Sequence, residues 1–330
     1  MIYLLLGLLI VAVVAAVHYA EVIAHKIGEP FGTIVLAISV TIIEVSLIVA
    51  MMLSDSEGAA YIARDAVFAA IMIVMNGVVG LCIFIGGLNH RELDFRIEGP
   101  NSAIAVLAAL ATFTLVLPVF ATSSPGPTFT NSQLAFAGIS SLVLYGVFLF
   151  FQTVSHRDYF LPQIDRLKTN HMVHATPPTN TKTIISAILL LIALVCVVGL
   201  AKALSPSIEK AVNYLDAPQT VVGIVIAALV LMPEGVAAIR AARANRLQTS
   251  LNLALGSALA SIGLTIPTVA IISVYFDMPL SLGIHPVGMV LLMLTLFVGL
   301  ITLALGKTTL LQGLIHLIIF ATYLFLSFIP

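Results

Sequence analysis

The sequence predicts an all-α integral membrane protein with about ten transmembrane helices, arranged as two inverted five-helix repeats. Of its 330 residues, 60% are hydrophobic and only 9% are charged, whereas about 25% of the residues are charged in a typical soluble domain. The charged residues gather in short clusters between apolar stretches of roughly 20 residues, the length that crosses a hydrocarbon core of about 30 Å. One longer hydrophilic stretch separates two sets of five apolar stretches.

Each apolar stretch is expected to be a helix, because backbone exposed to lipid has to satisfy its own hydrogen bonds. The first stretch has no basic N-terminal region and no small-residue cleavage site, so we expect a retained helix and not a signal peptide. A hydropathy window of about 19 residues places the ten spans at residues 2–20, 30–53, 64–87, 101–121, 131–153, 183–204, 217–239, 248–275, 283–304 and 308–329.

The longest hydrophilic stretch, Ser155 to Thr181, contains a Pro-Pro pair, Asn, Thr and charges of both signs, which is typical of a linker. We therefore expect a first five-helix repeat at 1–154, a cytoplasmic linker at 155–182 and a second five-helix repeat at 183–330. Because each half has an odd number of spans, the second half begins on the opposite side of the membrane. Two related halves would then form an inverted repeat.

The orientation follows from Lys and Arg, which accumulate on the cytoplasmic side. If the N-terminus faces outward, 11 of the 14 basic residues fall in inward segments. The three others are Arg64, Lys202 and Lys210. We therefore expect both termini on the outer side of the membrane.

Glu44 and Glu234 each lie in the middle of a long apolar run, in the second predicted span of each half. A carboxylate at the centre of a bilayer costs roughly 2.5–3.5 kcal/mol on insertion scales, so its default interpretation is an ion or proton site. Pro233 and Gly235 flank the second acid, and Pro removes one backbone hydrogen bond. This pattern predicts an interrupted helix at the second acid, as in many secondary transporters whose substrate site lies near the midplane.

The third predicted span of each half carries small and polar residues that favour a role beside the acids. Asn76 lies close to one helical stripe with Gly80, Phe84 and Gly87, and in the second half Ser257, Ser261 and Thr265 are spaced at i, i+4 and i+8. Such spacing places side chains on one face, and oxygen atoms are the ligands that hard cations prefer. We expect Glu44, Glu234, Asn76, Ser257 and Thr41 to bind a metal cation, and the two glutamates to couple it to protons.

Structural roles compete with these interpretations. A membrane glutamate or the Ser/Thr stripe can hold helices together, and Asn76 can bridge helices. Arg64 and Asp65 are expected to mark the membrane interface. His18 and His316 are candidates for a proton relay, although a hydrogen-bonded or snorkelling histidine is the more common case. We interpret the two cysteines as small core residues. The sequence has no basic stripe of the kind that binds nucleic acid.

Three segments resemble bacterial calcium/sodium(potassium):proton antiporters of the cation/calcium exchanger (CaCA, CAX-like) superfamily. They are TIIEVSLIV (Thr41 to Val49), the block from Val230 to Pro267, and GEPFGT (Gly28 to Thr33). The resemblance implies an antiporter of the bacterial inner membrane, in which Glu44 and Glu234 bind cation and proton alternately and Asn76 and Ser257 match polar positions of the companion helices. Two features depart from the family pattern. Amides are missing beside both acids, and the linker is basic where many vacuolar relatives have an acidic helix.

These observations predict a secondary active cation:proton antiporter that works by alternating access and is not an enzyme. Ca²⁺ is the expected cation, with Na⁺ and K⁺ as alternatives, and we expect no bound cofactor and no obligatory protein partner. Two buried carboxylates repel, so at least one should hold a proton when no cation is bound. A uniporter or channel remains an alternative. An intramembrane lipid-phosphate hydrolase is another, but it would need arginine or serine groups at a phosphate, and the two glutamate spans contain no buried arginine.

Overall fold

The computed structural model describes residues 2–28, 31–53, 58–90, 92–160, 178–214 and 218–329. Within these residues, ten helical spans are long and apolar enough to cross a membrane, which confirms the predicted all-α membrane fold. Most of the predicted linker, residues 161–177, lies outside the described residues. In chain order, the helical elements are α1 (Ile2–Ile27), α2 (Phe31–Met52), η1 (Ala59–Tyr61), α3 (Ile62–Met72), η2 (Ile73–Val78), α4 (Val79–His90), α5 (Glu98–Ala111), η3 (Thr112–Val116), α6 (Leu117–Phe120), α7 (Asn131–Phe150), η4 (Phe151–Ser155), η5 (Arg157–Tyr159), α8 (Asn180–Tyr214), α9 (Thr220–Arg243), α10 (Leu247–Ala260), η6 (Ser261–Thr265), α11 (Ile266–Tyr275), α12 (Pro286–Ala304) and α13 (Leu310–Phe328).

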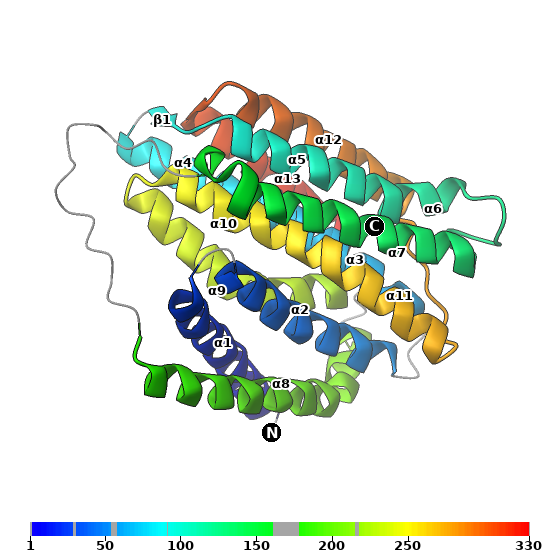
Figure 1. Ribbon diagram of the computed structural model, residues 1–330. Coiled ribbons are helices and arrows are strands. Elements are labelled where there is room, and N and C mark those ends of the chain that lie inside the picture. Colours follow the sequence, from blue (N-terminus) through cyan, green and yellow to red (C-terminus); the bar gives the residue numbers. More distant parts are fainter. Residues whose placement is uncertain are drawn as a thin grey trace.

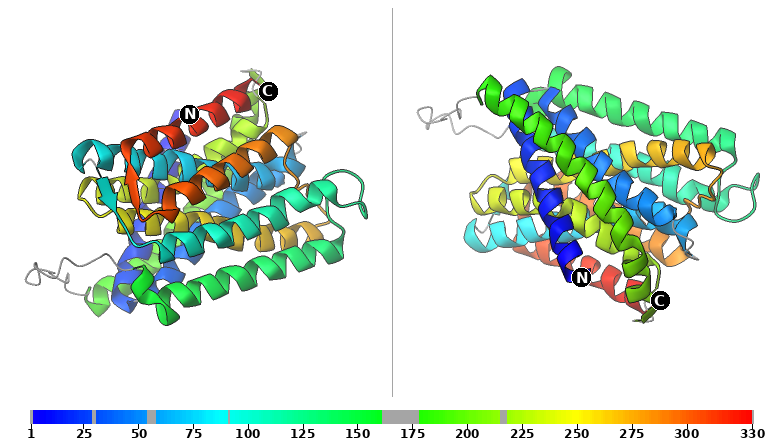
Figure 2. Two further views of the ribbon diagram at one scale, coloured as in Figure 1. Left: turned by 90° about the horizontal axis from the view of Figure 1, so that it is seen from above. Right: turned by 90° about the horizontal axis from the view of Figure 1, so that it is seen from below.

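Two hydrophobic cores hold these helices together. The larger core joins the third, fourth, fifth, eighth, ninth and tenth spans, and the smaller one joins α1, α2 and α8. α3 and α9 contribute residues to both cores. Figure 1 shows α1 and α8 together below the main stack of helices, and the view from below in Figure 2 shows them crossing that face of the molecule. We call the larger group of helices the scaffold.

The third and eighth spans are the two most buried ones, and they run side by side through the middle of the molecule (Figure 1). Each contains a π-helical segment, η2 in the third span and η6 in the eighth. A π-helical turn holds an extra residue, changes the direction of the side chains that follow, and is frequent at functional sites. Asn76 falls in η2, and Ser261 and Thr265 fall in η6, whereas Ser257 lies one turn before η6, in α10.

Two sequence-based expectations need correction, and one feature was not expected. α9 is a continuous helix through Pro233. In a packed bundle, neighbouring helices can satisfy the backbone carbonyl that loses its partner to a proline, so the helix does not have to break. Arg64 and Asp65 do not mark an exposed interface, since the helix begins earlier and both side chains are buried. A small sheet was not expected. β1 (Glu92–Asp94) pairs antiparallel with β2 (Lys307–Thr309), with Leu93 opposite Thr308. The strands pair because the short connection between α4 and α5 lies beside the one between α12 and α13.

Candidate cation-binding site

Glu44 lies in the middle of α2 and is almost completely buried, at 2% exposure. Its two carboxylate oxygens accept hydrogen bonds from the second half of the chain. Ser261 Oγ donates to one oxygen at 2.6 Å and Thr265 Oγ1 donates to the other at 2.9 Å. Both donors belong to the π-helical segment η6. The acid of the first half is therefore held by the eighth span.

Glu234 lies on α9 and accepts a hydrogen bond from Ser257 Oγ on α10. Ser257 and Ser261 are four residues apart, or about 6 Å along a helix axis. Neighbouring turns of one helix thus bind the two acids, one from each half. The prediction that Glu44 and Glu234 come close together in the middle of the bundle agrees with this geometry.

The three hydroxyls suit a site for a hard cation. A Ser or Thr hydroxyl has one donor hydrogen and two acceptor lone pairs, and here each hydrogen is directed at a carboxylate. The lone pairs of Ser257, Ser261 and Thr265 are then available to a cation lying between the acids. Carboxylate and hydroxyl oxygens are ligands that Ca²⁺ and other hard cations accept.

A cavity of about 340 Å³ leads to one of the two acids. We call it the entry cavity. Glu234 and Ser257 lie at its inner part, and Glu21 and Arg157, near the ends of the first and fifth spans, lie on the side where the basic loops gather. Glu21 and Glu234 therefore line the same cavity. The full lining consists of Glu21, Leu36, Ala37, Tyr145, Leu149, Gln152, Thr153, Arg157, Phe160, Glu234, Ala237, Thr249, Asn252, Leu253, Gly256, Ser257 and Ala260.

Thr41, one of the predicted ligands, lies on α2 three residues before Glu44 and is buried. Its hydroxyl donates to the carbonyl of Ala37, one turn earlier on the same helix, at 2.8 Å. Ala37 lines the entry cavity. Thr41 is thus placed near the path to the site, and its role as a ligand stays a prediction.

Asn76 takes part in a different polar network. Its Nδ2 donates to Thr295 Oγ1 at 2.8 Å, and its Oδ1 lies 2.9 Å from His316 Nδ1. His316 is completely buried, and its Nε2 lies 3.1 Å from Thr302 Oγ1. The structure therefore brings Asn76 together with the ninth and tenth spans, and its side-chain hydrogen bonds to Met72, Thr295 and His316 reach neither glutamate. Its role as a metal ligand stays a prediction.

The small residues of the third span pack against the tenth. A Cβ added at Gly80 would lie 2.8 Å from His316 Cβ, and one added at Gly313 would lie 2.5 Å from the backbone of Phe84. Such close approach of two helices is the usual role of small residues in membranes. The stripe in the third span is therefore a packing surface that brings His316 to Asn76.

Sequence reasoning noticed Ser261 and Thr265 only as members of a stripe and left them out of the site. Their spacing from Ser257 was the available signal, since all three hydroxyls had to share one helix face. Glu21 was missed because it lies near the end of its span, where an acid has an ordinary explanation. Its proximity to Glu234 depends on how α1 packs, which no local pattern reveals.

The fold and the site together define a secondary transporter of cations: ten spans, two membrane acids from different halves, and hydroxyl oxygens between them. The family model described as sodium/calcium exchanger protein matches residues 1–154 and 185–329. The chain belongs to this family, and it is a cation antiporter and not an enzyme.

Individual relatives agree with this assignment. The chain is 52% identical to y4hA of Sinorhizobium fredii, described as an ionic transporter, over 98% of this chain and 87% of the relative. It is 33% identical to the sodium-potassium/proton antiporter ChaA of Escherichia coli, over 95% and 85% of the two chains. Among solved structures, native YfkE has a TM-score of 0.75 at 17% identity, covering 98% of this chain and 90% of its own. The H⁺/Ca²⁺ exchanger CAX has a TM-score of 0.69 at 17% identity, covering 97% and 84%.

Proposed function

We propose that this protein exchanges a cation for protons, with Ca²⁺ as the favoured cation and Na⁺ and K⁺ as alternatives. The observation that carries the proposal is the convergence of Glu44 and Glu234 on neighbouring turns of the eighth span. Two ionised carboxylates carry two negative charges, which one divalent cation neutralises completely. A monovalent cation leaves one charge, so a proton would have to accompany it.

Competition for the same oxygens couples the two fluxes. When Ca²⁺ occupies the site, both carboxylates have to be ionised, so their protons leave, whereas a monovalent cation requires only one of the two protons to leave. When protons return from the other side of the membrane, the site loses the negative charge that holds the cation. Rocking of one group of helices against the other exposes the site to each side in turn. The two hydrophobic cores supply two groups that could move in this way.

The location we propose is the inner membrane of a bacterium, with both termini outside. The support is the distribution of basic residues, of which 11 of 14 fall in the segments assigned to the cytoplasm. In this orientation the entry cavity faces the cytoplasm, because Glu21 and Arg157 lie at that end of their spans. Cations then reach Glu234 from the cytoplasm in the conformation described.

Substitution of the acids tests the antiport. Glu44→Gln and Glu234→Gln are each expected to abolish proton-coupled cation flux in everted membrane vesicles, because the amide carries neither the proton nor the charge. Glu98→Gln serves as a matched control, since Glu98 is an exposed acid at the start of α5. Normal exchange in either glutamate variant would remove the basis of the proposal. If the wild-type cation flux does not change with an imposed pH gradient, the protein is a uniporter or channel instead.

Proton release identifies the cation. The purified protein is titrated with Ca²⁺, Na⁺ and K⁺ in turn, and Ca²⁺ is expected to release protons at the lowest concentration. The Glu44→Gln and Glu234→Gln variants should release fewer protons than the wild type. Release by Na⁺ or K⁺ without release by Ca²⁺ would overturn the choice of cation and leave antiport standing.

A further inference from the structure

A second cavity, of about 530 Å³, lies at the opposite end of α9 from the entry cavity. We call it the outer cavity. On α9 it is lined by Thr220, whereas the entry cavity reaches Glu234, about 21 Å further along the helix. The site described above does not include it. Its lining consists of Gly58, Tyr61, Arg64, Asp65, Phe68, Pro218, Gln219, Thr220, Ile284, His285, Val287, Gly288, Leu291, Tyr323, Leu326 and Ser327.

The outer cavity resembles the entry cavity in part when the two halves are exchanged, although it is also lined by Val287, Gly288 and Leu291 of the ninth span. The entry cavity uses the fifth span of the first half and the start of the third span of the second half, and the outer cavity uses the tenth span and the start of the third. Tyr145 on α7 and Tyr323 on α13 occupy equivalent positions in these fifth spans. Tyr145 lines the entry cavity together with Glu234, and Tyr323 lines the outer cavity together with Asp65. Asp65 is thus the acid in the lining of the outer cavity, on the third span of its half, whereas Glu234 lines the entry cavity from the second span of its half.

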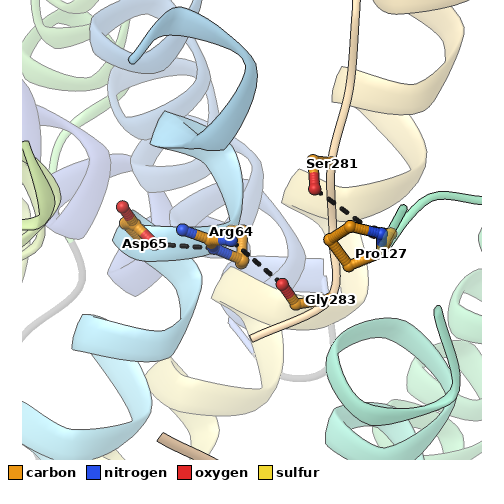
Figure 3. Close-up of polar contacts among 5 residues, drawn as sticks. All are labelled: Arg64, Asp65, Pro127, Ser281 and Gly283. Atoms are coloured by element: carbon orange, nitrogen blue, oxygen red, sulfur yellow. Dashed lines mark hydrogen bonds and ion pairs between the residues drawn. The ribbon is translucent and has the colours of Figure 1, made fainter. Parts of the chain in front are cut away.

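Asp65 is neutralised by a cation from its own helix. Arg64 Nε donates to Asp65 Oδ1 at 2.7 Å, and both side chains are buried. Arg64 Nη1 also donates to the carbonyl of Gly283 at 3.0 Å, and the guanidinium lies 4.6 Å from the ring centre of Tyr61. Figure 3 shows Arg64 between Asp65 and Gly283, which is in the connection from α11 to α12.

The connection that holds Arg64 is itself fixed to the scaffold. Ser281 N donates to the carbonyl of Ala60 at 3.0 Å, and Gly283 N donates to the carbonyl of Pro127 at 3.1 Å. Ser281 Oγ also donates to the carbonyl of Pro127, at 3.2 Å (Figure 3). Arg64 is therefore held in place whether or not α9 moves. This allows Asp65 to change partner without loss of the loop structure.

α3 and α9 close the path from the outer cavity to the acids. A Cβ added at Gly223 would lie 2.7 Å from the backbone carbon of Asp65 and 2.8 Å from the backbone nitrogen of Ala66. The two helices therefore touch one turn deeper than the outer cavity. Glu234 lies eleven residues beyond Gly223, or about 16 Å. Separation of α9 from α3 would join the outer cavity to the site.

We propose that the outer cavity is the vestibule through which the cation reaches or leaves the site on the side opposite the entry cavity. Asp65 is its cation-binding carboxylate, and Arg64 is the internal cation that neutralises Asp65 while no transported cation is bound there. The inference rests on the proposed antiport function and adds a third transport carboxylate to it.

A disulfide across the vestibule tests whether it has to open. A Cβ added at Gly58 would lie 2.9 Å from Gln219 Cβ, so Gly58→Cys with Gln219→Cys needs a movement of only about 1 Å to reach disulfide geometry. The pair is made in a Cys196→Ala background, because Cys196 is exposed and Cys82 is buried. Oxidation should stop cation:proton exchange, and reduction should restore it. Each single cysteine variant serves as a control under the same oxidant.

Cation binding separates this test from the antiport proposal. The oxidised protein should still release protons when titrated with Ca²⁺, because the entry cavity reaches Glu234 without passing the disulfide. Exchange that continues with the disulfide fully formed would overturn the vestibule. Loss of proton release in the oxidised protein would also overturn the vestibule proposal, since the disulfide would then disturb the cation site itself and not only the vestibule. Absence of release in the wild type would instead count against the antiport proposal.

A neutral double variant tests the role of Asp65. Removal of Asp65 alone leaves Arg64 buried without its partner, which is strongly destabilising, whereas replacement of both members of a buried pair is often tolerated. Asp65→Asn combined with Arg64→Gln should raise the KM for Ca²⁺ at the outer face by about tenfold or more, as expected for loss of one charge–charge contact. The KM at the cytoplasmic face should stay within about twofold of wild type. Right-side-out and everted vesicles measure the two faces separately.

The conservative variant completes the test. Asp65→Glu keeps the carboxylate and is expected to retain most of the outer-face affinity that the neutral double variant loses. If Asp65 served only to anchor Arg64, the neutral double variant would show an unchanged KM at both faces, and the assignment of Asp65 would be overturned. An equal rise in KM at both faces would overturn it as well.

Discussion

Glu44 and Glu234 differ in their surroundings, although they hold equivalent places in the two halves. Glu44 has both carboxylate oxygens hydrogen-bonded, to Ser261 and Thr265, and no described cavity reaches it. Glu234 accepts a hydrogen bond from Ser257 and lines the entry cavity. An incoming cation therefore meets Glu234 first in this conformation. Glu44 is the inner acid, and its ionisation completes the charge that holds the cation.

Loss of one hydroxyl should weaken cation binding without removing either acid. Ser261→Ala deletes a donor to Glu44 and an oxygen available to the cation, and hydrogen bonds to charged groups contribute roughly 1.5–3 kcal/mol. We expect the apparent Ca²⁺ affinity in the proton-release titration to fall by about tenfold or more. Ser141→Ala is the matched control, because Ser141 is equally buried and donates only to Ala137 of its own helix. Equal affinities in the two variants would show that Ser261 is not a ligand.

Among the elements, the eighth span has the largest part in the site. α10 supplies Ser257 to one acid, and η6 supplies Ser261 and Thr265 to the other. The sequence predicted that these hydroxyls share a helix face, because their spacing is local. It could not predict the π-helical turn, which depends on how neighbouring helices pack. The sequence likewise gave no sign that Asn76 meets His316, since 240 residues separate them.

Helix contact at Gly223 should control the balance between the two conformations. Gly223→Ala places a methyl group against the backbone of Asp65, so α3 and α9 can no longer pack as closely. We expect the outer cavity to open more often, with faster labelling of a single cysteine at Ser327 by a membrane-impermeant maleimide. The Cys196→Ala background removes the exposed native thiol.

A second glycine provides the control for this measurement. Gly199→Ala makes the same substitution in α8, in a span of similar length. A Cβ added at Gly199 would meet nothing within 4 Å. Labelling at Ser327 should stay at the wild-type rate in that variant. If Gly223→Ala also labels at the wild-type rate, the α3–α9 contact does not close the outer cavity.

For the whole molecule, hydropathy and charge were sufficient to predict the number of spans and the membrane fold. These properties are set by the bilayer and act on each segment separately, so they can be read from composition. The division into a scaffold and a smaller group of α1, α2 and α8 was not visible in the sequence. It depends on which apolar faces meet, and nearly every face of these spans is apolar. Some helices are also longer than the spans predicted from hydropathy, because packing against the rest of the protein stabilises their ends. The third span, for example, runs from Ala59 to His90, whereas the prediction was 64–87.

The hydrogen bonds from η6 to Glu44 have a consequence for a severed chain. Glu44 belongs to the N-terminal half, and its donors Ser261 and Thr265 belong to the C-terminal half. Neither half alone therefore contains all the residues of the binding site. Two polypeptides encoded separately, 1–160 and 178–330, should each enter the membrane as five spans and remain inactive when made alone. Co-expression should restore exchange, because assembly of the fragments rebuilds the shared pocket. Activity from a single fragment would show that ion recognition needs only one glutamate.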